Sequence, residues 1–369
     1  MRVVTIFGTR PEIIRLSRVI PLLDAHCEHI TVHTGQNFEE SLSTVFFRDL
    51  RLRTPDVQLG IRATSFGDQL AQIIIGIESL LRERRPDAVL ILGDTNSALS
   101  AIVAARLGIP VFHMEAGNRC YDDRVPEEVN RRIIDHSSSF LLPYTERSKE
   151  NLIREGIERE RIFVTGNPIF EVIESFSPEI AASTVLERLG LEPRGFYLAT
   201  MHRAENVDDP RRLALLVEGL SLLAEQHGVP VIVSVHPRTA SRLAAENVVA
   251  RSARVRFLEP FGFFDFIRLE KSAALVLSDS GTVQEECAIF GVPNITIRDV
   301  TERPETLECG SNILAGVDPE SMLRAAALVL ASGSDWIAPA GYEARSVSRT
   351  VAKIVLGRSE RRRYGVNTG

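Results

Sequence analysis

The sequence predicts an α/β protein made of two doubly wound domains, each built around a parallel sheet. Short apolar runs alternate with longer stretches in which apolar residues recur at three- and four-residue spacing, a pattern typical of βαβ units. The alternation forms two series, separated by a loop-forming Gly-Asn-Pro at residues 166–168. The 369 residues, 44% of them hydrophobic, are enough for two domains of roughly 150–200 residues.

The two series predict the order of strands and helices. In the first series, strands are expected at 2–7, 29–35, 87–94 and 110–117, with helices at 11–26, 38–50 and 95–108. In the second series, strands are expected at 196–202, 230–237, 255–260, 274–281 and 293–299, with helices at 210–228 and 282–291. We therefore expect an N-terminal domain at 1–167, a C-terminal domain at 168–355 and a tail at 356–369. A further helix over 346–360 cannot be placed in either domain from the sequence alone.

The composition excludes several classes of protein. The net charge is −6, and Lys and Arg are scattered apart from a short basic run at 358–365, so we expect no nucleic-acid partner. The four cysteines are far apart and have no Cys/His spacing, so neither a disulfide framework nor a zinc site is expected. No apolar segment reaches the roughly 18 residues of a membrane span, and a strand is expected to begin within two residues of Met1. A cytoplasmic protein without a metal or cofactor is the simplest interpretation.

Polar residues that directly follow predicted strands mark the candidate site. In open α/β sheets, ligands bind outside the carboxyl ends of the strands. Such strand ends occur in both domains, which predicts one interdomain active-site cleft. They are Gly8 to Arg10, Gly93 to Thr95, His113 to Gly117, His202-Arg203, His236-Pro237, Ser278 to Gly281 and Arg298 to Arg303.

Two of these strand ends have the character of anion sites. Ser280 and Gly281 precede a predicted helix, whose backbone N–H groups and positive terminus suit a phosphate, although an ordinary helix cap also explains Ser280. Glu285 and Glu286 would repel an anion there unless one carboxylate faces a ribose. In "FGTRPE" a turn with one glycine is followed by Arg10. The planar guanidinium of an arginine can donate two hydrogen bonds at once, which suits a diphosphate. The alternative for Arg10 is a surface salt bridge to Glu12.

Three carboxylates are candidates for acid and base chemistry. Asp94, Glu115 and Glu127 follow or flank strand ends, and carboxylates gathered in one cleft raise one another's pKa values and can act as general acid and base. Asp94 has the alternative of a helix N-cap, and Glu127 that of a partner for a helix dipole. A histidine at a strand end is more often structural than catalytic, which is the alternative for His113, His202 and His236. His202 is singled out because "MHRAEN" places a cation and two hydrogen-bonding groups beside it. Their spacing does not match a metal site.

These motifs resemble the non-hydrolysing UDP-N-acetylglucosamine 2-epimerase family. The resemblance covers residues 1 to about 355 and is carried by "FGTRPE", "GDT", "EAG", "PEE-NR", "TGN", "DSG-QEE" and "RD-TERPE". It implies a GT-B fold of two Rossmann-like domains and a cytoplasmic isomerase, usually a homodimer, that supplies polysaccharide biosynthesis. The family interconverts UDP-GlcNAc and UDP-ManNAc by eliminating UDP to give 2-acetamidoglucal and then adding UDP back.

The resemblance also assigns roles to residues. Asp94, Glu115 and Glu127 would be the acid/base carboxylates of the N-terminal domain, with Arg131 and His202 supporting them. UDP would be held mainly by the C-terminal domain. The resemblance implies a set of substrate- and UDP-binding residues, with Glu286 on the ribose, comprising Arg10, Arg15, Arg131, His202, His236, Ser280, Gly281, Glu286 and Arg303.

The chain departs from the common family pattern at several positions. Arg15 replaces a lysine, "EAGNRC" replaces "EAGLRT", and "DSGT" replaces "DSGG". These changes resemble a branch acting on other UDP-acetamido sugars, such as UDP-2,3-diacetamido-glucuronate or the precursor of UDP-N-acetyl-fucosamine. The segment at 36–39 differs from the family's activator loop, which predicts hyperbolic kinetics without added UDP-GlcNAc. A GT-B glycosyltransferase, a hydrolysing 2-epimerase and a nucleotide-sugar sensor are the alternatives from other classes.

Overall fold

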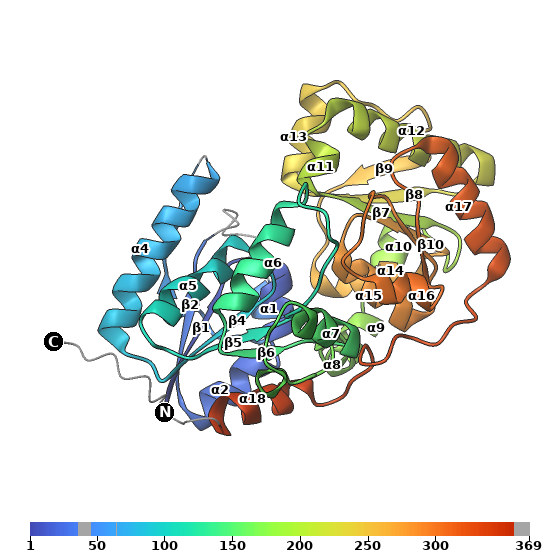
Figure 1. Cartoon of the computed structure of the whole chain (residues 1–369). Coiled ribbons are helices and arrows are strands. Elements are labelled where there is room, and N and C mark those ends of the chain that lie inside the picture. Colours follow the sequence, from blue (N-terminus) through green and yellow to red (C-terminus); the bar gives the residue numbers. More distant parts are fainter. Residues whose placement is uncertain (36–45, 64, 358–369) are drawn as a thin grey trace. The chain divides into compact units, whose positions relative to one another are not determined.

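The computed structural model describes residues 1–35, 46–63 and 65–357 (Figure 1). The chain forms two compact units, one made of Met1–Ile173 together with the segment from Gly341 onward, and one made of Glu174–Ala340. Each unit contains its own six-stranded sheet. Residues 36–39, compared above with an activator loop, lie outside the described residues, as does the tail from residue 358.

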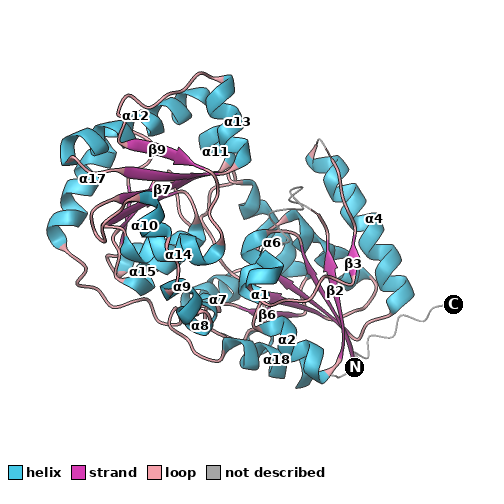
Figure 2. Ribbon diagram, turned by 180° about the vertical axis from the view of Figure 1, so that it is seen from behind, coloured by secondary structure: helices cyan, strands magenta, loops and turns pink. Residues whose placement is uncertain are grey.

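The sheet of the first unit is parallel throughout, in the order β3-β2-β1-β4-β5-β6. Its strands are β1 Arg2–Phe7, β2 Glu28–His33, β3 Val57–Gln58, β4 Ala88–Leu92, β5 Val111–Met114 and β6 Phe140–Leu142. The central strands β1, β4 and β5 are almost wholly buried because helices cover both faces of the sheet, which explains their continuous apolar runs (Figure 2).

Amphipathic helices cover this sheet. They are α1 Arg10–Leu16, α2 Val19–His26, α4 Phe66–Arg84, α5 Ala101–Arg106, α6 Pro126–Ser137, α7 Glu146–Arg154, α8 Ile169–Ser175 and α18 Val347–Gly357, with short 3₁₀ helices at Asn96–Ser100 and Arg159–Arg161. One core cluster joins Val4 and Ile6 of β1 to the buried stripe of α4 at Ile73 and Ile77. The spacing of that stripe is the helical period expected for a face turned to a core.

The sheet of the second unit is also parallel throughout, in the order β12-β11-β10-β7-β8-β9. Its strands are β7 Tyr197–Met201, β8 Val231–Val235, β9 Val255–Leu258, β10 Leu275–Ser278, β11 Asn294–Thr296 and β12 Asn312–Leu314. Counted from the first strand of each unit, the two sheets have the same order, that of the Rossmann fold. The expected pair of Rossmann-like domains is therefore confirmed.

Helices lie on both faces of the second sheet (Figure 2). They are α9 Ser177–Ala181, α10 Val185–Leu189, α11 Ala204–Val207, α12 Pro210–His227, α13 Pro237–Ala245, α14 Phe263–Ser272, α15 Gly281–Phe290, α16 Pro304–Glu308 and α17 Pro319–Ser332. Tyr197, Ala199 and Met201 of β7 belong to one core cluster, and Leu198 belongs to another. This alternation follows from the two-residue period of a strand and gives the sheet a separate core on each side.

Three strands were not predicted from the sequence. They are β3, β6 and β12, which have two or three residues each and lie at the edges of the sheets. Runs this short carry too little periodicity to be distinguished from loops. Of the helix expected at 38–50, residues 46–49 are helical and the earlier part lies outside the described residues.

The C-terminal segment returns to the first unit, which differs from the domain boundaries expected from the sequence. Helix α18 packs against α2 (Figure 1). The Asn167 N–H donates to the Gly341 carbonyl at 2.9 Å, and Ser348 donates to the Glu171 carboxylate through its backbone N–H at 2.8 Å. Gly341 has φ 93°, and a Cβ at this position would lie 2.6 Å from the Tyr144 carbonyl oxygen. Only glycine therefore fits where the chain returns to the first unit.

The described part of the chain contains no helix with the length and apolar character needed to cross a bilayer. The four cysteines are free thiols.

Candidate functional site

Each sheet has a topological switch point, where strands that follow in the chain stop being added on one side of the first strand and are added on its other side. In the first unit this point lies between β1 and β4, and in the second between β7 and β10. Ligands of doubly wound sheets bind beside the carboxyl ends of the strands at this point. The predicted site residues surround these ends in each unit. We call Arg10, Arg15, Asp94, Glu115, Glu127 and Arg131 the N-terminal cluster, and His202, His236, Ser280, Gly281, Glu286 and Arg303 the C-terminal cluster.

Glu115 is the most constrained carboxylate of the N-terminal cluster. It follows β5 with φ 67°, a left-handed conformation that is costly for a residue other than glycine, and it is 8% exposed. The Arg15 guanidinium donates to its Oε2 atom, the Tyr144 hydroxyl donates to the same oxygen at 3.3 Å, and the Asn118 amide donates to Oε1 at 3.3 Å. Arg15 also lies over the Tyr144 ring, 5.7 Å from its centroid. These contacts hold the carboxylate in one orientation.

Asp94 lies beside Glu115 and has its own arginine. The Arg131 Nε atom donates to Asp94 Oδ2 at 2.9 Å, while Arg131 Nη1 donates to Glu128 Oε2 at 2.6 Å. A Cβ built on Gly93 would lie 3.9 Å from Glu115 Oε2, which places the Glu115 carboxylate next to the Gly93-Asp94 turn. The expected gathering of these two carboxylates at neighbouring strand ends is thus present, and each is paired with a different arginine.

The two glutamates that begin α6 have different surroundings. Glu127, the predicted candidate, is half-buried in the first turn. Glu128 is fully buried and accepts hydrogen bonds from the backbone N–H groups of Cys120 and Tyr121, at 3.0 Å each. Burial opposes ionisation of Glu128, but these bonds and the Arg131 charge lower its pKa overall. Sequence reasoning missed Glu128, which fixes the loop after Glu115 and orients Arg131.

A buried pair supports the same strand ends from behind. His113 is hydrogen-bonded through Nδ1 to Asp135 at 2.8 Å and through Nε2 to the Gly93 carbonyl at 2.8 Å. Asp135 also accepts from the Gly117 N–H at 3.1 Å and forms an ion pair with Arg119 at 2.8 Å. Burial opposes ionisation of Asp135, but His113 and Arg119 lower its pKa. His113 therefore has a structural role, and Asp135 ties the turn at Gly93 to the turn at Gly117.

The turn after β1 is organised by Glu12. This side chain is 1% exposed and accepts hydrogen bonds from the Gly8 N–H at 3.1 Å, the Thr9 N–H at 2.8 Å and the Thr95 hydroxyl at 3.2 Å. Burial raises its pKa to about 7. Because Glu12 is buried, a surface salt bridge with Arg10 is not its role. Arg10 begins α1, and its guanidinium carbon lies 5.9 Å from the centre of the Phe46 ring.

In the C-terminal cluster, His202 is held by a buried aspartate that the sequence analysis did not select. Asp279 accepts hydrogen bonds from the backbone N–H groups of His202 and Arg203, at 3.0 Å each, and from the Asn206 amide at 3.2 Å. His202 Nδ1 lies 3.0 Å from Asp279 Oδ1. Burial opposes ionisation, but His202 and these donors lower the pKa of Asp279 to about 2. The feature of the sequence that indicates Asp279 is its position at a strand end, between Ser278 and Ser280.

Ser280 is the N-cap of α15 and Gly281 is its first residue, so the helix begins one residue earlier than predicted. The Ser280 N–H donates to the Ser278 hydroxyl at 3.0 Å. A Cβ on Gly281 would lie 2.5 Å from Glu302 Oε1 and 3.6 Å from the Arg303 guanidinium carbon, so only glycine fits this close approach. Arg303 donates through Nε to Glu285. The structure thus places an arginine beside the first turn of α15, with its charge partly balanced by Glu285.

The two remaining members of the C-terminal cluster lie on different helices. Glu286 on α15 is 3% exposed and has the Glu270 carboxyl group of α14 as a neighbour. His236 is the N-cap of α13, where its Nδ1 atom accepts from the Arg238 N–H at 3.3 Å. This contact is a structural role for His236.

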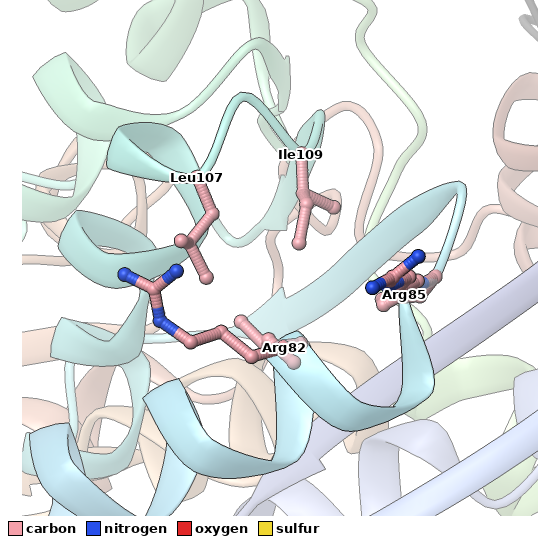
Figure 3. Close-up of a pocket in the computed structure, with 6 residues that line it drawn as sticks. Arg82, Arg85, Leu107 and Ile109 are labelled. Carbon is pink, nitrogen blue, oxygen red and sulfur yellow. The ribbon is translucent and has the colours of Figure 1, made fainter. Parts of the chain in front are cut away.

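One surface cavity of about 470 Å³ lies elsewhere in the first unit (Figure 3). It is lined by Leu81, Arg82, Arg85, Pro86, Leu107 and Ile109. These residues come just before β4 and β5 begin, so the cavity lies at the amino ends of the strands. The N-terminal cluster lies at the opposite ends, and none of its residues lines the cavity.

Comparison with known proteins identifies similar sequences and folds across the chain. The sequence profile described as UDP-N-acetylglucosamine 2-epimerase matches residues 23–356. A Methanocaldococcus jannaschii protein named UDP-N-acetylglucosamine 2-epimerase is 40% identical over 372 aligned positions, which cover 97% of this chain and 100% of that protein. A Pseudomonas aeruginosa protein named UDP-2,3-diacetamido-2,3-dideoxy-D-glucuronate 2-epimerase is 36% identical over 330 positions, covering 88% and 91% respectively.

The fold comparison agrees with the sequence comparison. The crystal structure of the Methanocaldococcus jannaschii UDP-GlcNAc 2-epimerase in complex with UDP-GlcNAc and UDP matches with a TM-score of 0.92 at 39% sequence identity. The match covers 97% of this chain and 100% of that one. Similarity of this extent includes both units.

Proposed function

The chain belongs to the UDP-N-acetylglucosamine 2-epimerase family, and we propose that it interconverts UDP-GlcNAc and UDP-ManNAc by eliminating and re-adding UDP. The observation that carries this proposal is the pair of strand-end carboxylates, Glu115 and Asp94, each oriented by its own arginine. Such a pair can supply the base and the acid that an elimination and its reversal require.

The proposed reaction begins with removal of the proton at C2 of the sugar. That proton lies beside an acetamido group and is not acidic enough to be removed and returned directly. A base instead takes it as the C1–O bond to UDP breaks, which forms the C1–C2 double bond of 2-acetamidoglucal and releases the UDP anion. Re-addition of UDP at C1 and of a proton to the opposite face of C2 gives the epimer.

In this proposal the N-terminal cluster handles the protons. Glu115, Asp94 and Glu127 are the acid/base carboxylates. Arg15 keeps Glu115 oriented and Arg131 keeps Asp94 oriented, each through an ion pair. His202 takes part from the other unit, supported by the Asp279 carboxylate. A carboxylate on each side of C2 would account for protonation of either face.

The C-terminal cluster holds UDP in this proposal. Ser280 and Gly281 at the start of α15 present backbone N–H groups to the diphosphate, beside the Arg303 guanidinium. Glu286 accepts from the ribose hydroxyls. Arg10 and His236 complete the set of binding residues. A hydrogen-bond donor directed at the negative charge that develops on the departing UDP can lower the activation free energy by about 3 kcal/mol.

A panel of UDP-acetamido sugars followed by proton NMR in D2O tests the function. We expect UDP-GlcNAc to be converted into UDP-ManNAc without an acceptor, with deuterium incorporated at C2. Free ManNAc with UDP would indicate a hydrolysing epimerase, transfer only to an acceptor would indicate a glycosyltransferase, and binding without conversion would indicate a sensor. Each of these outcomes contradicts the proposal.

A second substrate is favoured by two specific observations. The Pseudomonas aeruginosa relative is named for UDP-2,3-diacetamido-2,3-dideoxy-D-glucuronate, and this chain has Thr282 where the common motif has glycine. The same panel decides between the substrates, because kcat/KM is measured for each UDP-acetamido sugar and the values are compared. A higher value for a diacetamido-glucuronate or an N-acetyl-fucosamine precursor would assign the enzyme to that branch and leave the reaction type unchanged.

The remaining elements of the proposal concern the state of the protein. We propose a cytoplasmic homodimer whose ligands are the UDP-acetamido sugar and UDP, with no added metal or cofactor. Sedimentation at working concentration tests the dimer. A monomer that is fully active would contradict it.

A further inference from the structure

Two carboxyl groups lie in contact in the interior of the second unit. Glu270 on α14 is 0% exposed and Glu286 on α15 is 3% exposed, and their carboxyl groups are neighbours within hydrogen-bonding reach. The two helices pack against each other. Two carboxylates in contact, away from water, cannot both be ionised without a large electrostatic cost.

The hydrogen bonds of Glu270 show where a proton can lie. The Cys287 thiol donates to Glu270 Oε1 at 3.3 Å. Glu270 Oε2 is buried and accepts no hydrogen bond from any donor of the described residues. A buried carboxylate oxygen without a donor is costly, whereas a protonated oxygen beside another carboxylate is a donor with a partner.

We infer that Glu270 is a carboxylic acid whose Oε2–H donates to Glu286, and that this bond positions the Glu286 carboxylate for the ligand. The inference rests on the proposed function in one respect, which is that Glu286 receives the ribose hydroxyls of UDP. Glu270 touches no ligand in this arrangement and is a positioning residue. Its proton lets the other carboxyl group, that of Glu286, remain an anion.

The electrostatic surroundings support a protonated Glu270. Burial, and then the Glu286 charge, raise its pKa well above the usual value. Burial together with Glu270 also raises the pKa of the Cys287 thiol, which therefore remains a neutral donor, and Asn294 of β11 contacts this thiol.

Other charged groups near α14 belong to separate contacts. On α14 itself, Asp265 pairs with Arg188 of α10. Helix α9, which also packs against α14, carries Glu179. The groups that act on Glu270 are the Glu286 carboxylate, through its charge, and the neutral Cys287 thiol, through its hydrogen bond.

The first experiment compares UDP affinity by calorimetry for the full chain and three variants. Glu270→Gln has an amide that can donate to Glu286 and a carbonyl that can accept from Cys287, so we expect an affinity within about twofold of wild type at pH 7. Glu270→Leu removes the hydrogen-bond donor to Glu286. We expect UDP affinity to fall about tenfold, which corresponds to the loss of one hydrogen bond to a charged group. Glu259→Gln, which changes an exposed glutamate of the same unit, is the control.

The dependence on pH separates this role from simple packing. As pH rises through the raised pKa of Glu270, a second negative charge appears beside Glu286, so UDP affinity of the wild type should fall relative to that of Glu270→Gln. Equal pH profiles for these two proteins, or equal loss in Glu270→Gln and Glu270→Leu, would overturn the inference.

An infrared measurement tests the proton without any ligand. At neutral pH the infrared difference between the wild type and Glu270→Gln should contain a carboxylic-acid C=O band, which is separate from any band of the buried Glu12 because Glu12 is common to both proteins. The difference between the wild type and Glu259→Gln should contain no such band. Absence of the band from the first difference would overturn the inference, whatever the enzyme's substrate. If the band is present but no variant alters UDP affinity, Glu270 is protonated and the assignment of Glu286 to UDP has failed instead.

Discussion

At the scale of single residues, the N-terminal cluster is defined by how its carboxylates are restrained. Glu115 combines a left-handed backbone conformation with an arginine, a tyrosine and an asparagine around its carboxyl group. Backbone strain of roughly 1–3 kcal/mol persists only where the surroundings fix it, and it is common at functional sites. Neutral variants of Glu115 and Asp94 therefore test the chemistry with little change in shape.

We expect Glu115→Gln and Asp94→Asn each to lower kcat at least roughly a hundredfold, the usual contribution of a general acid or base. UDP affinity, measured by calorimetry, should change little because the proposed UDP contacts lie mainly in the other unit. Glu146→Gln, which removes an exposed carboxylate of the same unit, is the matched control. Near-normal turnover in both site variants would defeat the assignment.

The Asp279 carboxylate gives a residue-scale prediction about acid stability. Its pKa is lowered from 3.8 to about 2 in the folded protein, so its contribution to stability is present above about pH 4 and is lost as pH falls toward 2. The size is roughly 2 kcal/mol. In acid denaturation, Asp279→Asn should show less loss of unfolding free energy between pH 4 and 2 than wild type. Parallel curves for the two proteins would contradict this.

At the scale of elements, the turn from β1 to α1 is fixed by one buried carboxylate. Glu12 accepts from the Gly8 and Thr9 N–H groups at the start of the helix and from Thr95 after β4. A single side chain thereby joins the two strand ends of the topological switch point in the first unit. This explains why the turn presents Arg10 with only one glycine.

The raised pKa of Glu12 predicts a pH dependence of opposite sign to that of Asp279. Burial raises the pKa from 4.5 to about 7, so the folded protein binds a proton more tightly than the unfolded chain, and stability falls as pH rises through this interval. The effect is roughly 3 kcal/mol. Chemical denaturation between pH 5 and 7.5 should show a smaller fall for Glu12→Gln than for wild type. The same slope in both proteins would show that Glu12 is already ionised throughout.

At the scale of the whole molecule, the last helix belongs to the first unit although it follows the second in the chain. Val351 and Val355 of α18 are fully buried, and the helix packs against α2. The second unit is therefore an insertion between two parts of the first. This arrangement makes the stability of the first unit depend on residues near the C-terminus.

Val351→Ala tests this dependence, since it removes two buried methyl groups and should cost about 2 kcal/mol. We expect the free energy of unfolding to fall in the first unit only. Trp336, the only tryptophan, lies in the second unit and donates to the Ala288 carbonyl at 3.0 Å, so its fluorescence reports on that unit. Circular dichroism should show an earlier transition while the Trp336 transition keeps its midpoint. Val249→Ala at an exposed position is the control, and an earlier Trp336 transition in Val351→Ala would contradict the placement.

The sequence by itself determined the two doubly wound units, the order of the main strands and the strand-end positions of Arg10, Asp94, Glu115 and Ser280. These features depend on local patterns, because an apolar run followed by a turn marks both a parallel strand and the end where ligands bind. The motifs at those ends also indicated the family.

Only the tertiary structure decided which polar groups meet. Arg15 and Glu115 are 100 residues apart, His202 and Asp279 are 77 apart, and Ser348 and Glu171 are 177 apart. Burial and pairing across such distances leave no periodic signal in the chain. For that reason the roles of Glu128, Asp279 and Glu270, and the return of the last helix to the first unit, follow from packing and not from sequence pattern.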